Sequence, residues 1–232
     1  MPTVTGDSSV SATPRSDRGG KGLTRELIVE TAVGFADEHG VAAMSMRKLA
    51  AELGCEAMSI YNHLPNKSAL LDAAVDAVAA EVEYPADDVG WKAGVHAVAD
   101  STFRALIRHP WAIELWTKQF PLEHRLRMME VLLDLLARAE LDEHLADIAF
   151  HAVHLHVVGF AQQATAYADS FDDDADQRFE TEVSMADFPR LVEHKAYHDA
   201  VDAGTVDRPD TFTFVLGLIL DGIERTAGYG DS

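Results

Sequence analysis

Apolar residues recur every three to four positions along nearly all of the chain after residue 22, and this spacing constrains the fold most strongly. A period near 3.6 places apolar side chains on one face of an α-helix, whereas a half-buried strand needs alternation at every second position. No such alternation persists in the 232 residues, and no repeat recurs at the spacing of a solenoid. The sequence therefore predicts an all-α protein.

Capping residues divide the first part of this pattern into four helices. Thr24, Ser45 and Asn66 each precede an apolar run, as N-caps do, and Gly40 and Gly54 end two of the runs. The predicted helices are the run from the Thr24 cap to Gly40, Met46–Leu53, Ala57–His63 and Asn66–Glu83.

The rest of the chain predicts further helices and one acidic loop. The loop is Asp169–Asp176, which we expect to be mobile. The predicted helices are Gly90–Arg108, Trp111–Gln119, Pro121–Ala139, Asp142–Tyr167, Ala186–Ala203 and Pro209–Ala227. The predicted organisation is a disordered tail (1–22), a small three-helix domain (23–68), a connecting helix (66–83) and a larger helical domain (84–232).

The formal charge of −20 speaks against a nucleic-acid partner until it is divided along the chain. Residues 1–67 hold seven Lys/Arg and eight Asp/Glu, a net −1, while the remaining 165 residues hold 12 and 31, a net −19. The first part is thus neutral, and its tail is a loosely basic segment suited to a phosphate backbone or simply solvated. We expect the acidic part to repel DNA, with Asp172–Asp174 contributing, and so to suppress non-specific binding.

One cysteine excludes a disulfide framework, and no apolar run of about 18 residues predicts a membrane span. The first 22 residues also lack the apolar stretch of a signal peptide. We therefore expect a soluble, cytoplasmic protein.

The second and third predicted helices form a helix-turn-helix candidate. Gly54 tolerates the tight turn between them, and Ala50 is small where the helices would cross. Leu49, Leu53 and Ile60 are suited to fill the space between these two helices and the first helix. An ordinary helical hairpin in a helical core is the alternative. In the DNA-binding interpretation, the third helix would lie in the major groove and present Ala57, Met58, Ser59, Tyr61, Asn62 and His63.

Three segments carry a resemblance to a known family: Ser45–Gly54, Ile60–Leu64 and Asn66–Leu71. Together they resemble the DNA-binding domain of the TetR family of repressors, over roughly Leu23 to Val75. The Tyr-x-His-hydrophobic-x-x-Lys run after a Leu-Gly turn is far more specific than a bare helix-turn-helix. The segment Phe212–Ile223 is more loosely similar to the C-terminal helix of the tetracycline-repressor branch.

The resemblance implies roles for individual residues. Arg47 would contact a phosphate or a guanine edge, and Lys67 would pair with a phosphate from the start of the next helix. Tyr61 and His63 would donate to phosphates, and Ser59 would donate to a phosphate or touch a base. The predicted DNA-binding residues are Arg47, Lys48, Ala57, Met58, Ser59, Tyr61, Asn62, His63 and Lys67. Because the tetracycline repressor presents a glutamine and a proline at positions 57 and 58, we do not expect a tetracycline operator.

The resemblance also implies a homodimer with a ligand-binding body. The helices Asp142–Tyr167 and Pro209–Ala227 would form a four-helix bundle between subunits, the alternative being that the latter is buried in its own subunit. Aromatic, methionine and histidine side chains suit a mostly apolar small molecule, although plain core is an alternative for each. The predicted ligand-binding residues are Phe103, His109, Trp116, Phe120, Met128, His151, His154 and Phe160.

Eleven histidines raise the alternative of a helical metal-dependent enzyme. His151 and His154 share a helical face from which His156 points away, and His194 and His198 have a chelating spacing but no HExxH arrangement. We expect no metal or other cofactor. No nucleophile elbow, phosphate loop or dinucleotide fingerprint occurs, so we expect no enzyme.

The sequence thus predicts a homodimeric transcriptional repressor that binds a palindromic operator and is released by a small-molecule inducer. An activator of the same family is the remaining alternative.

Overall fold

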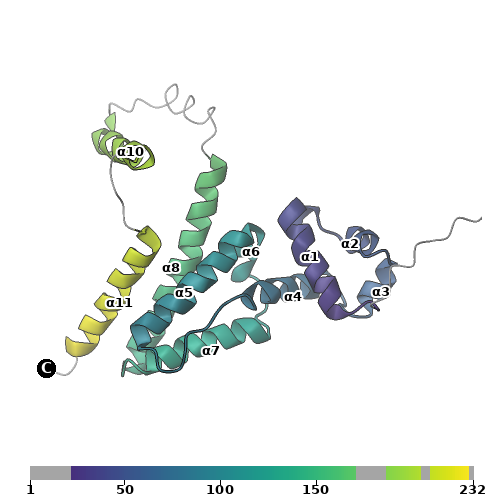
Figure 1. Cartoon of the computed structure of the whole chain (residues 1–232), viewed down its shortest axis with the longest axis horizontal. Helices are drawn as coiled ribbons and strands as arrows, with labels where there is room; N and C mark the ends of the chain where they lie inside the picture. Colours follow the sequence, from purple (N-terminus) through teal and green to yellow (C-terminus); the bar gives the residue numbers. More distant parts are fainter. Residues whose placement is uncertain (1–21, 171–186, 205–209, 230–232) are drawn as a thin grey trace, which may run out of the picture.

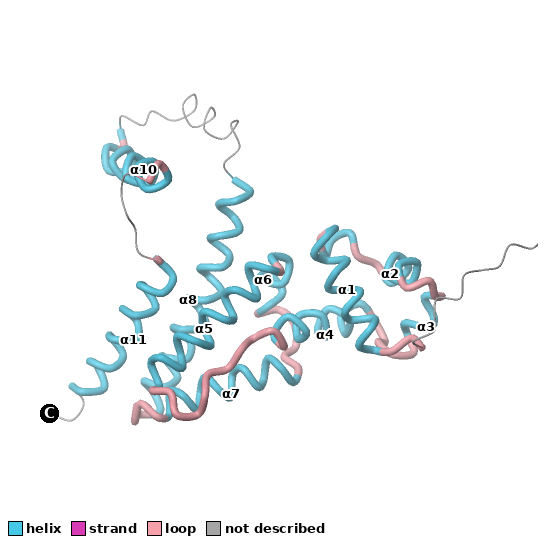
Figure 2. Tube along the Cα trace, in the orientation of Figure 1, coloured by secondary structure: helices cyan, strands magenta, loops and turns pink. Residues whose placement is uncertain are grey.

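The computed structural model describes residues 22–170, 187–204 and 210–229. Over these residues the protein consists of helices and loops without a strand, which confirms the all-α prediction (Figures 1 and 2). The predicted disordered tail, up to residue 21, and most of the predicted acidic loop lie outside the described residues. None of the described helices is both long and apolar enough to cross a membrane.

The first helices form a small bundle, here called the head. Its elements are α1 (Arg25–His39), a 3₁₀ turn η1 (Val41–Ala43), α2 (Met46–Glu52) and α3 (Ala57–Tyr61). The predicted caps are confirmed. Thr24 Oγ1 accepts a hydrogen bond from the Leu27 N–H at 3.2 Å, and Ser45 Oγ accepts one from the Lys48 N–H at 3.3 Å. Gly40 ends α1 with a φ of 73°, a conformation that favours glycine.

The next helix, α4 (Lys67–Ala79), belongs to two hydrophobic cores. Asn66 caps it, because its Oδ1 accepts from the Ala69 N–H at 2.8 Å. The first half of α4 buries Leu70 and Ala73 in the core of the head. Its second half buries Val75, Val78 and Ala79 in the core of the following helices. Figure 1 shows α4 running from the head into the rest of the molecule.

The prediction that this helix continues to Glu83 is wrong by about one turn. The chain leaves the helix after Ala79 in two tight turns, and the Glu83 N–H donates to Ser101 Oγ at 2.8 Å instead of to a helical carbonyl. The structure thus replaces the last helical turn with a tertiary hydrogen bond, which local sequence patterns do not reveal.

The remaining helices form a larger domain, here called the body. They are α5 (Trp91–Arg108), α6 (Pro110–Trp116), α7 (Glu123–Ala137), α8 (Glu143–Ser170), α10 (Pro189–Asp202) and α11 (Thr211–Tyr229). α8 packs against α5, α6, α7 and α11 and so forms the centre of the body, whereas α10 lies apart from these helices in Figure 1.

Two carboxylates of α4 attach this helix to the body. The Asp76 carboxylate, which is buried, accepts hydrogen bonds from the backbone N–H groups of His124 at 3.2 Å and Arg125 at 3.0 Å. Asp72 Oδ1 accepts from the Phe120 N–H at 3.2 Å. Because Asp76 satisfies N–H groups in the first turn of α7, it acts as a cap supplied by a neighbouring helix.

Candidate DNA-binding and ligand-binding sites

The turn between α2 and α3 has the geometry that the sequence predicts. Gly54 has a φ of 65°, and the N–H of Cys55 donates to the Ala50 carbonyl at 2.9 Å. Leu49 and Ile60 are fully buried, and the small Ala50 is 3% exposed. Leu53 packs against the same core from a half-buried position. The two short helices are therefore held at a fixed angle by apolar packing and by the turn.

The outer face of α3 is exposed, as a helix that reads DNA requires. Met58 is 69% exposed and Tyr61 is 43% exposed, although side chains of this size are usually buried. Asn62 and His63 are exposed as well, and Ala57 and Ser59 are half-buried. Each of these six predicted residues therefore retains exposed surface at the α3 end of the head.

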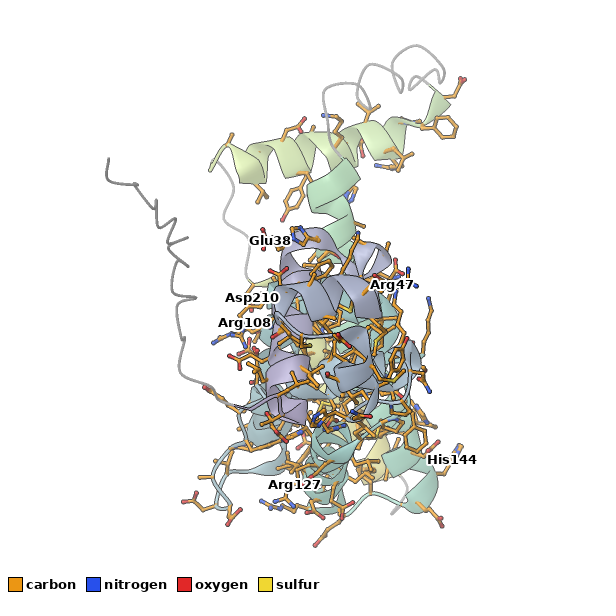
Figure 3. All side chains as sticks on the ribbon, turned by 90° about the vertical axis from the view of Figure 1, so that its right-hand side faces the viewer. Glu38, Arg47, Arg108, Arg127, His144 and Asp210 are labelled. Carbon is orange, nitrogen blue, oxygen red and sulfur yellow. The ribbon has the colours of Figure 1, made fainter. Side chains whose placement is uncertain are left out.

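The predicted cationic residues of the head differ in their surroundings. Arg47 is exposed on α2, in the part of the molecule that faces the viewer in Figure 3. Lys67 Nζ donates to the carbonyls of Met44 at 2.7 Å and Val41 at 3.4 Å, and Lys48 Nζ donates to that of Ala43 at 2.9 Å. Both lysines thus tie the η1 segment to the helices around it, a structural role that sequence reasoning missed. An ammonium group carries three N–H donors, so neither contact excludes a phosphate.

In the body, two of the predicted ligand-binding residues belong to one aromatic cluster. Phe103 of α5 and Phe160 of α8 contact each other with ring centroids 5.7 Å apart. Phe212 of α11 stacks on Phe103 at 4.4 Å, and His156 stacks on Phe212 at 4.8 Å. The cluster therefore joins three helices of the body.

Sequence reasoning missed Phe212 and His156 as members of this cluster. His156 Nε2 lies 3.0 Å from the carbonyl oxygen of Phe212, so this nitrogen carries a proton and donates it. Burial lowers the pKa of His156 and keeps its imidazole neutral. The spacing of His156 and Phe160, four residues apart on one helix, was the available signal.

Trp116 of α6, Met128 of α7 and His154 of α8 lie outside this aromatic cluster. Trp116 and Met128 are buried, at 1% and 3% exposure. Burial lowers the pKa of His154, and the positive charge of Arg125 lowers it further. Arg125, which sequence reasoning missed, is buried; its guanidinium lies 5.4 Å from the centre of the Trp116 ring.

Three predicted ligand-binding residues do not join these groups. Phe120 is 69% exposed in the loop before α7. His151 is exposed and lies 3.6 Å from Asp147 on its own helix. His109 is buried, but it lies between the head and the body, where it contacts Asp37 of α1. The sequence placed His151 on a predicted body helix and His109 and Phe120 directly beside such helices, but only tertiary packing determines which of them face inward.

The described histidines do not assemble a metal site. His194 and His198 bring their Nε2 atoms within 3.2 Å on an exposed part of α10. Among the residues that the structure describes, however, no three His, Cys, Asp or Glu side chains come together in a way that could hold a metal ion.

The exposed recognition helix on a small head, joined to a helical body, defines a helix-turn-helix transcription regulator. Residues 28–74 match the family described as bacterial regulatory proteins, tetR family. Residues 84–227 match the family described as tetracyclin repressor-like, C-terminal domain. The chain belongs to the TetR family, which makes it a DNA-binding regulator rather than the metal-dependent enzyme considered above.

Two similar proteins differ in sequence identity and in how much of each chain is matched. The HTH-type transcriptional repressor DrrR1 of Streptomyces coeruleorubidus is 44% identical over 104 residues, which is 44% of this chain and 38% of that protein. The chain thus spans well under half the length of this relative. The class C tetracycline repressor of Escherichia coli is 26% identical over 88% of this chain and 91% of its own length.

The solved structure of the Streptomyces coelicolor TetR family protein ActR in complex with actinorhodin has the same fold. It superimposes with a TM-score of 0.70 at 30% sequence identity and covers 89% of this chain and 99% of that one. Head and body are thus arranged in this chain as in a solved member of the family.

Proposed function

We propose that this chain is a cytoplasmic, homodimeric transcriptional repressor that binds a palindromic operator and is released by a small-molecule inducer. The observation that carries the proposal is the exposed face of α3 on a head whose core holds it rigidly. In this mechanism the two α3 helices of a dimer enter successive major grooves, and the two-fold symmetry of the dimer matches that of the operator.

The chemistry of the head supports contacts with DNA. Arg47 is suited to a phosphate or a guanine edge, and Tyr61 and His63 are suited to phosphates. Ala57 and Met58 offer apolar contacts, for instance to a thymine methyl group. Residues 1–67 are nearly neutral, so the head does not repel a polyanion as the acidic body does.

An apolar face on α8 and α11 supports the homodimer. On α11, Phe212, Leu216 and Leu220 are buried within the chain, whereas Phe214 and Leu218 are 55% and 54% exposed. On α8, Leu155 is 68% exposed and Ile148 is 45% exposed. Large apolar side chains in such a stripe are typical of a protein interface. The last helix thus offers one face to its own subunit and another to the proposed partner.

Glycines on the same two helices support this assignment. A Cβ atom added to Gly159 of α8 or Gly217 of α11 would meet nothing within 4 Å apart from its chain neighbours and the backbone of its own helix. These glycines therefore serve no close packing within the subunit. They are suited to a close approach between helices of two subunits, where a side chain would stand in the way.

The side chains inside the body support the proposal that the inducer is mostly apolar. The aromatic cluster of Phe103, Phe160 and Phe212 lies beside the neutral His156, which offers a single polar group among apolar ones. ActR, at 30% identity, was solved with actinorhodin, and we infer a ligand-binding role for the same domain here. An inducer acts only as far as it binds the state released from DNA more tightly than the operator-bound state.

Selection of bound DNA from a random pool tests the proposal directly. We expect the purified protein to enrich a palindrome whose half-sites are about one helical turn apart or a multiple of it. Analytical ultracentrifugation of the complex should give two chains for each operator. Enrichment of no palindrome, or of an asymmetric site bound by one chain, would overturn the proposal.

A further inference from the structure

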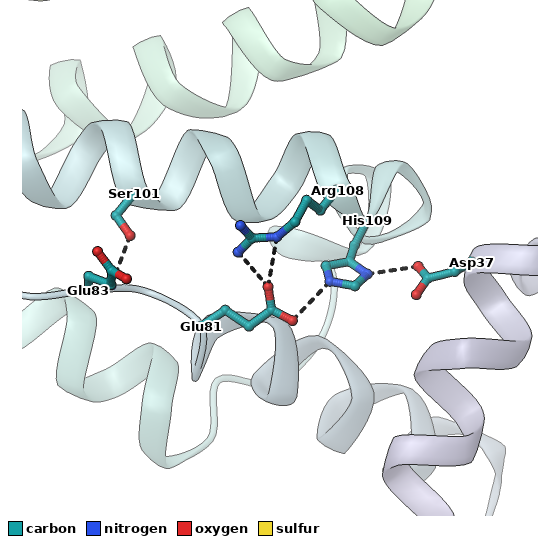
Figure 4. A network of polar contacts seen from close by, with 6 residues as sticks. All are labelled: Asp37, Glu81, Glu83, Ser101, Arg108 and His109. Atoms are coloured by element: carbon teal, nitrogen blue, oxygen red, sulfur yellow. Dashed lines mark hydrogen bonds and ion pairs between the residues drawn. The ribbon is translucent and has the colours of Figure 1, made fainter.

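His109 occupies the corner between two body helices, where the body meets the head. The backbone N–H of His109 donates to the Ala105 carbonyl of α5 at 3.1 Å, and Pro110 begins α6 directly after it. Only 9% of the residue is exposed. Figure 4 shows its ring between Asp37 on α1 and Glu81 just beyond α4. One side chain therefore contacts the head, the end of the connecting helix and the body.

Both ring nitrogens of His109 face a carboxylate. Nδ1 lies 2.7 Å from Asp37 Oδ1, and Nε2 lies 3.0 Å from Glu81 Oε1. An ionised carboxylate only accepts hydrogen bonds, and a neutral imidazole carries an N–H on only one of its nitrogens. Both contacts are hydrogen bonds only when the ring is an imidazolium. In the neutral ring, one nitrogen turns a lone pair towards a carboxylate oxygen.

The two carboxylates are also held by other donors. Arg108 donates to Glu81 Oε2 from Nε at 3.0 Å and from Nη2 at 2.5 Å. The indole N–H of Trp111 donates to Asp37 Oδ1 at 2.6 Å. The titratable and charged groups that face His109 are therefore Asp37 of α1, Glu81 after α4 and Arg108 of α5.

These contacts differ in what they connect. The Arg108–Glu81 ion pair links the body to the end of the connecting helix and remains in place whatever the state of the ring. The contact of His109 with Asp37 reaches the head, and charge-assisted hydrogen bonds of this kind are about twice as strong as neutral ones. Loss of the ring proton removes the positive charge and one of the two N–H donors, and thus weakens the junction of head, connecting helix and body.

We propose that His109 is a positioning residue for operator binding: as an imidazolium between Asp37 and Glu81 it fixes the head on the body, so that operator affinity depends on its protonation. The inference rests on the proposed function, because it requires that the two heads of a dimer match an operator. Because histidine is the side chain best suited to change its charge near neutral pH, the inference is tested by varying the pH.

The first test compares operator affinity at pH 6 and pH 8, by fluorescence anisotropy on the selected DNA, for the unchanged protein and for His109→Gln. We expect the unchanged protein to bind about fivefold more tightly than the variant at pH 6, a factor at the low end of those for coupled sites, and expect this ratio to become smaller as the pH rises. His39→Gln is the matched control, because His39 lies at the same end of α1 and its ion pair, with Glu38 at 3.8 Å, stays within the head.

Any change in affinity due to His63 at the DNA contacts appears in all three proteins and cancels from the comparison. Parallel pH profiles for the unchanged protein and His109→Gln would overturn the inference while leaving the proposed function intact. If the unchanged protein selects no operator, the proposed function fails, and the second test then decides on the junction alone.

The second test uses Trp111, whose indole donates to the same Asp37 oxygen, as a local reporter. We expect the intrinsic fluorescence to contain a pH-dependent component between pH 6 and 8 that is lost in Trp111→Phe and in His109→Gln. Asp37→Asn, which keeps the imidazole and removes the one of its two facing carboxylates that also binds the indole, should lose the component too. A component that persists unchanged in His109→Gln and Asp37→Asn would contradict the proton-dependent junction.

Discussion

The head and the body are both helical, but they leave opposite chemistry on their surfaces. The head buries its apolar residues around Leu49 and Ile60 and exposes polar and cationic side chains on α2 and α3. The body carries almost all of the net negative charge and exposes large apolar side chains on α8 and α11. The difference indicates that each region is built for a different partner, the head for a polyanion and the body for another apolar surface.

The exposed apolar face of α11 should give the largest effect when it is charged. Leu218→Glu is expected to raise the dissociation constant of the dimer by about a hundredfold or more, because a carboxylate would be buried without a partner at the interface. Sedimentation equilibrium measures this change. Leu218 is exposed within the single chain, so the variant should fold.

Leu126→Glu provides the matched control for this substitution. Leu126 is 52% exposed on α7, a helix that carries none of the exposed side chains of the proposed interface, and the chemical change is the same. We expect Leu126→Glu to remain dimeric. Equal dissociation by both variants would place the interface elsewhere or point to a general effect of added charge.

The two cores should respond alike to large-to-small substitutions. Leu49 of the head and Leu216 of the body are both fully buried, and replacement of either by alanine should destabilise the protein by about 3 kcal/mol. Because α4 belongs to both cores, we expect calorimetry to show one unfolding transition that both variants shift downward. Two transitions, each shifted by only one of the variants, would show that the cores unfold independently.

A smaller effect is expected for a single cation of the head. Arg47→Ala should weaken operator binding about tenfold and reduce by about one the slope of log affinity against log salt concentration. Arg190→Ala, which removes an exposed arginine of α10 paired with Glu193, should change neither quantity. Unchanged operator affinity in Arg47→Ala would remove this residue from the DNA contacts.

The smallest expected effect is the pH dependence of body stability. Burial lowers the pKa values of His154 and His156 in the folded protein, whereas in the unfolded chain they protonate near the ordinary value of about 6.5. Below that pH the unfolded state binds more protons, so stability should fall between pH 7 and pH 5. His156→Phe should reduce this fall in urea unfolding. The matched control is His144→Phe, at an exposed histidine of the same helix that does not act on the pKa of His154 or His156, and it should leave the fall unchanged.

The sequence was most informative where structure depends on neighbouring residues. The caps at Thr24, Ser45 and Asn66 each bond an N–H three residues ahead, so a short window of sequence contains both partners. The burial of Leu49 and Ile60 between the helices of the head was predictable for a similar reason, because both lie within one short motif.

The sequence was least informative where residues from distant segments meet. His109 contacts residues 72 and 28 positions away, and His156 contacts a carbonyl 56 positions away. Arg125 is buried although arginine is usually exposed, because it donates to the carbonyls of Trp116, at the end of α6, and of Gln119, in the loop that follows. Helical periodicity places such residues on a helix, but it does not specify which neighbour they meet.

The division of α4 between the two cores has a consequence for protein engineering. A designer who grafts this head onto the sensor of another regulator would have to transfer α4 at least as far as Ala73, because the head loses Leu70 and Ala73 from its core otherwise. Asp72 would come with the transferred segment, whereas the recipient would have to supply an acceptor of its own at the position of Asp76, or provide a loop that does without it. In a working chimera, the junction between the two sequences therefore lies in the middle of a helix and not in a loop.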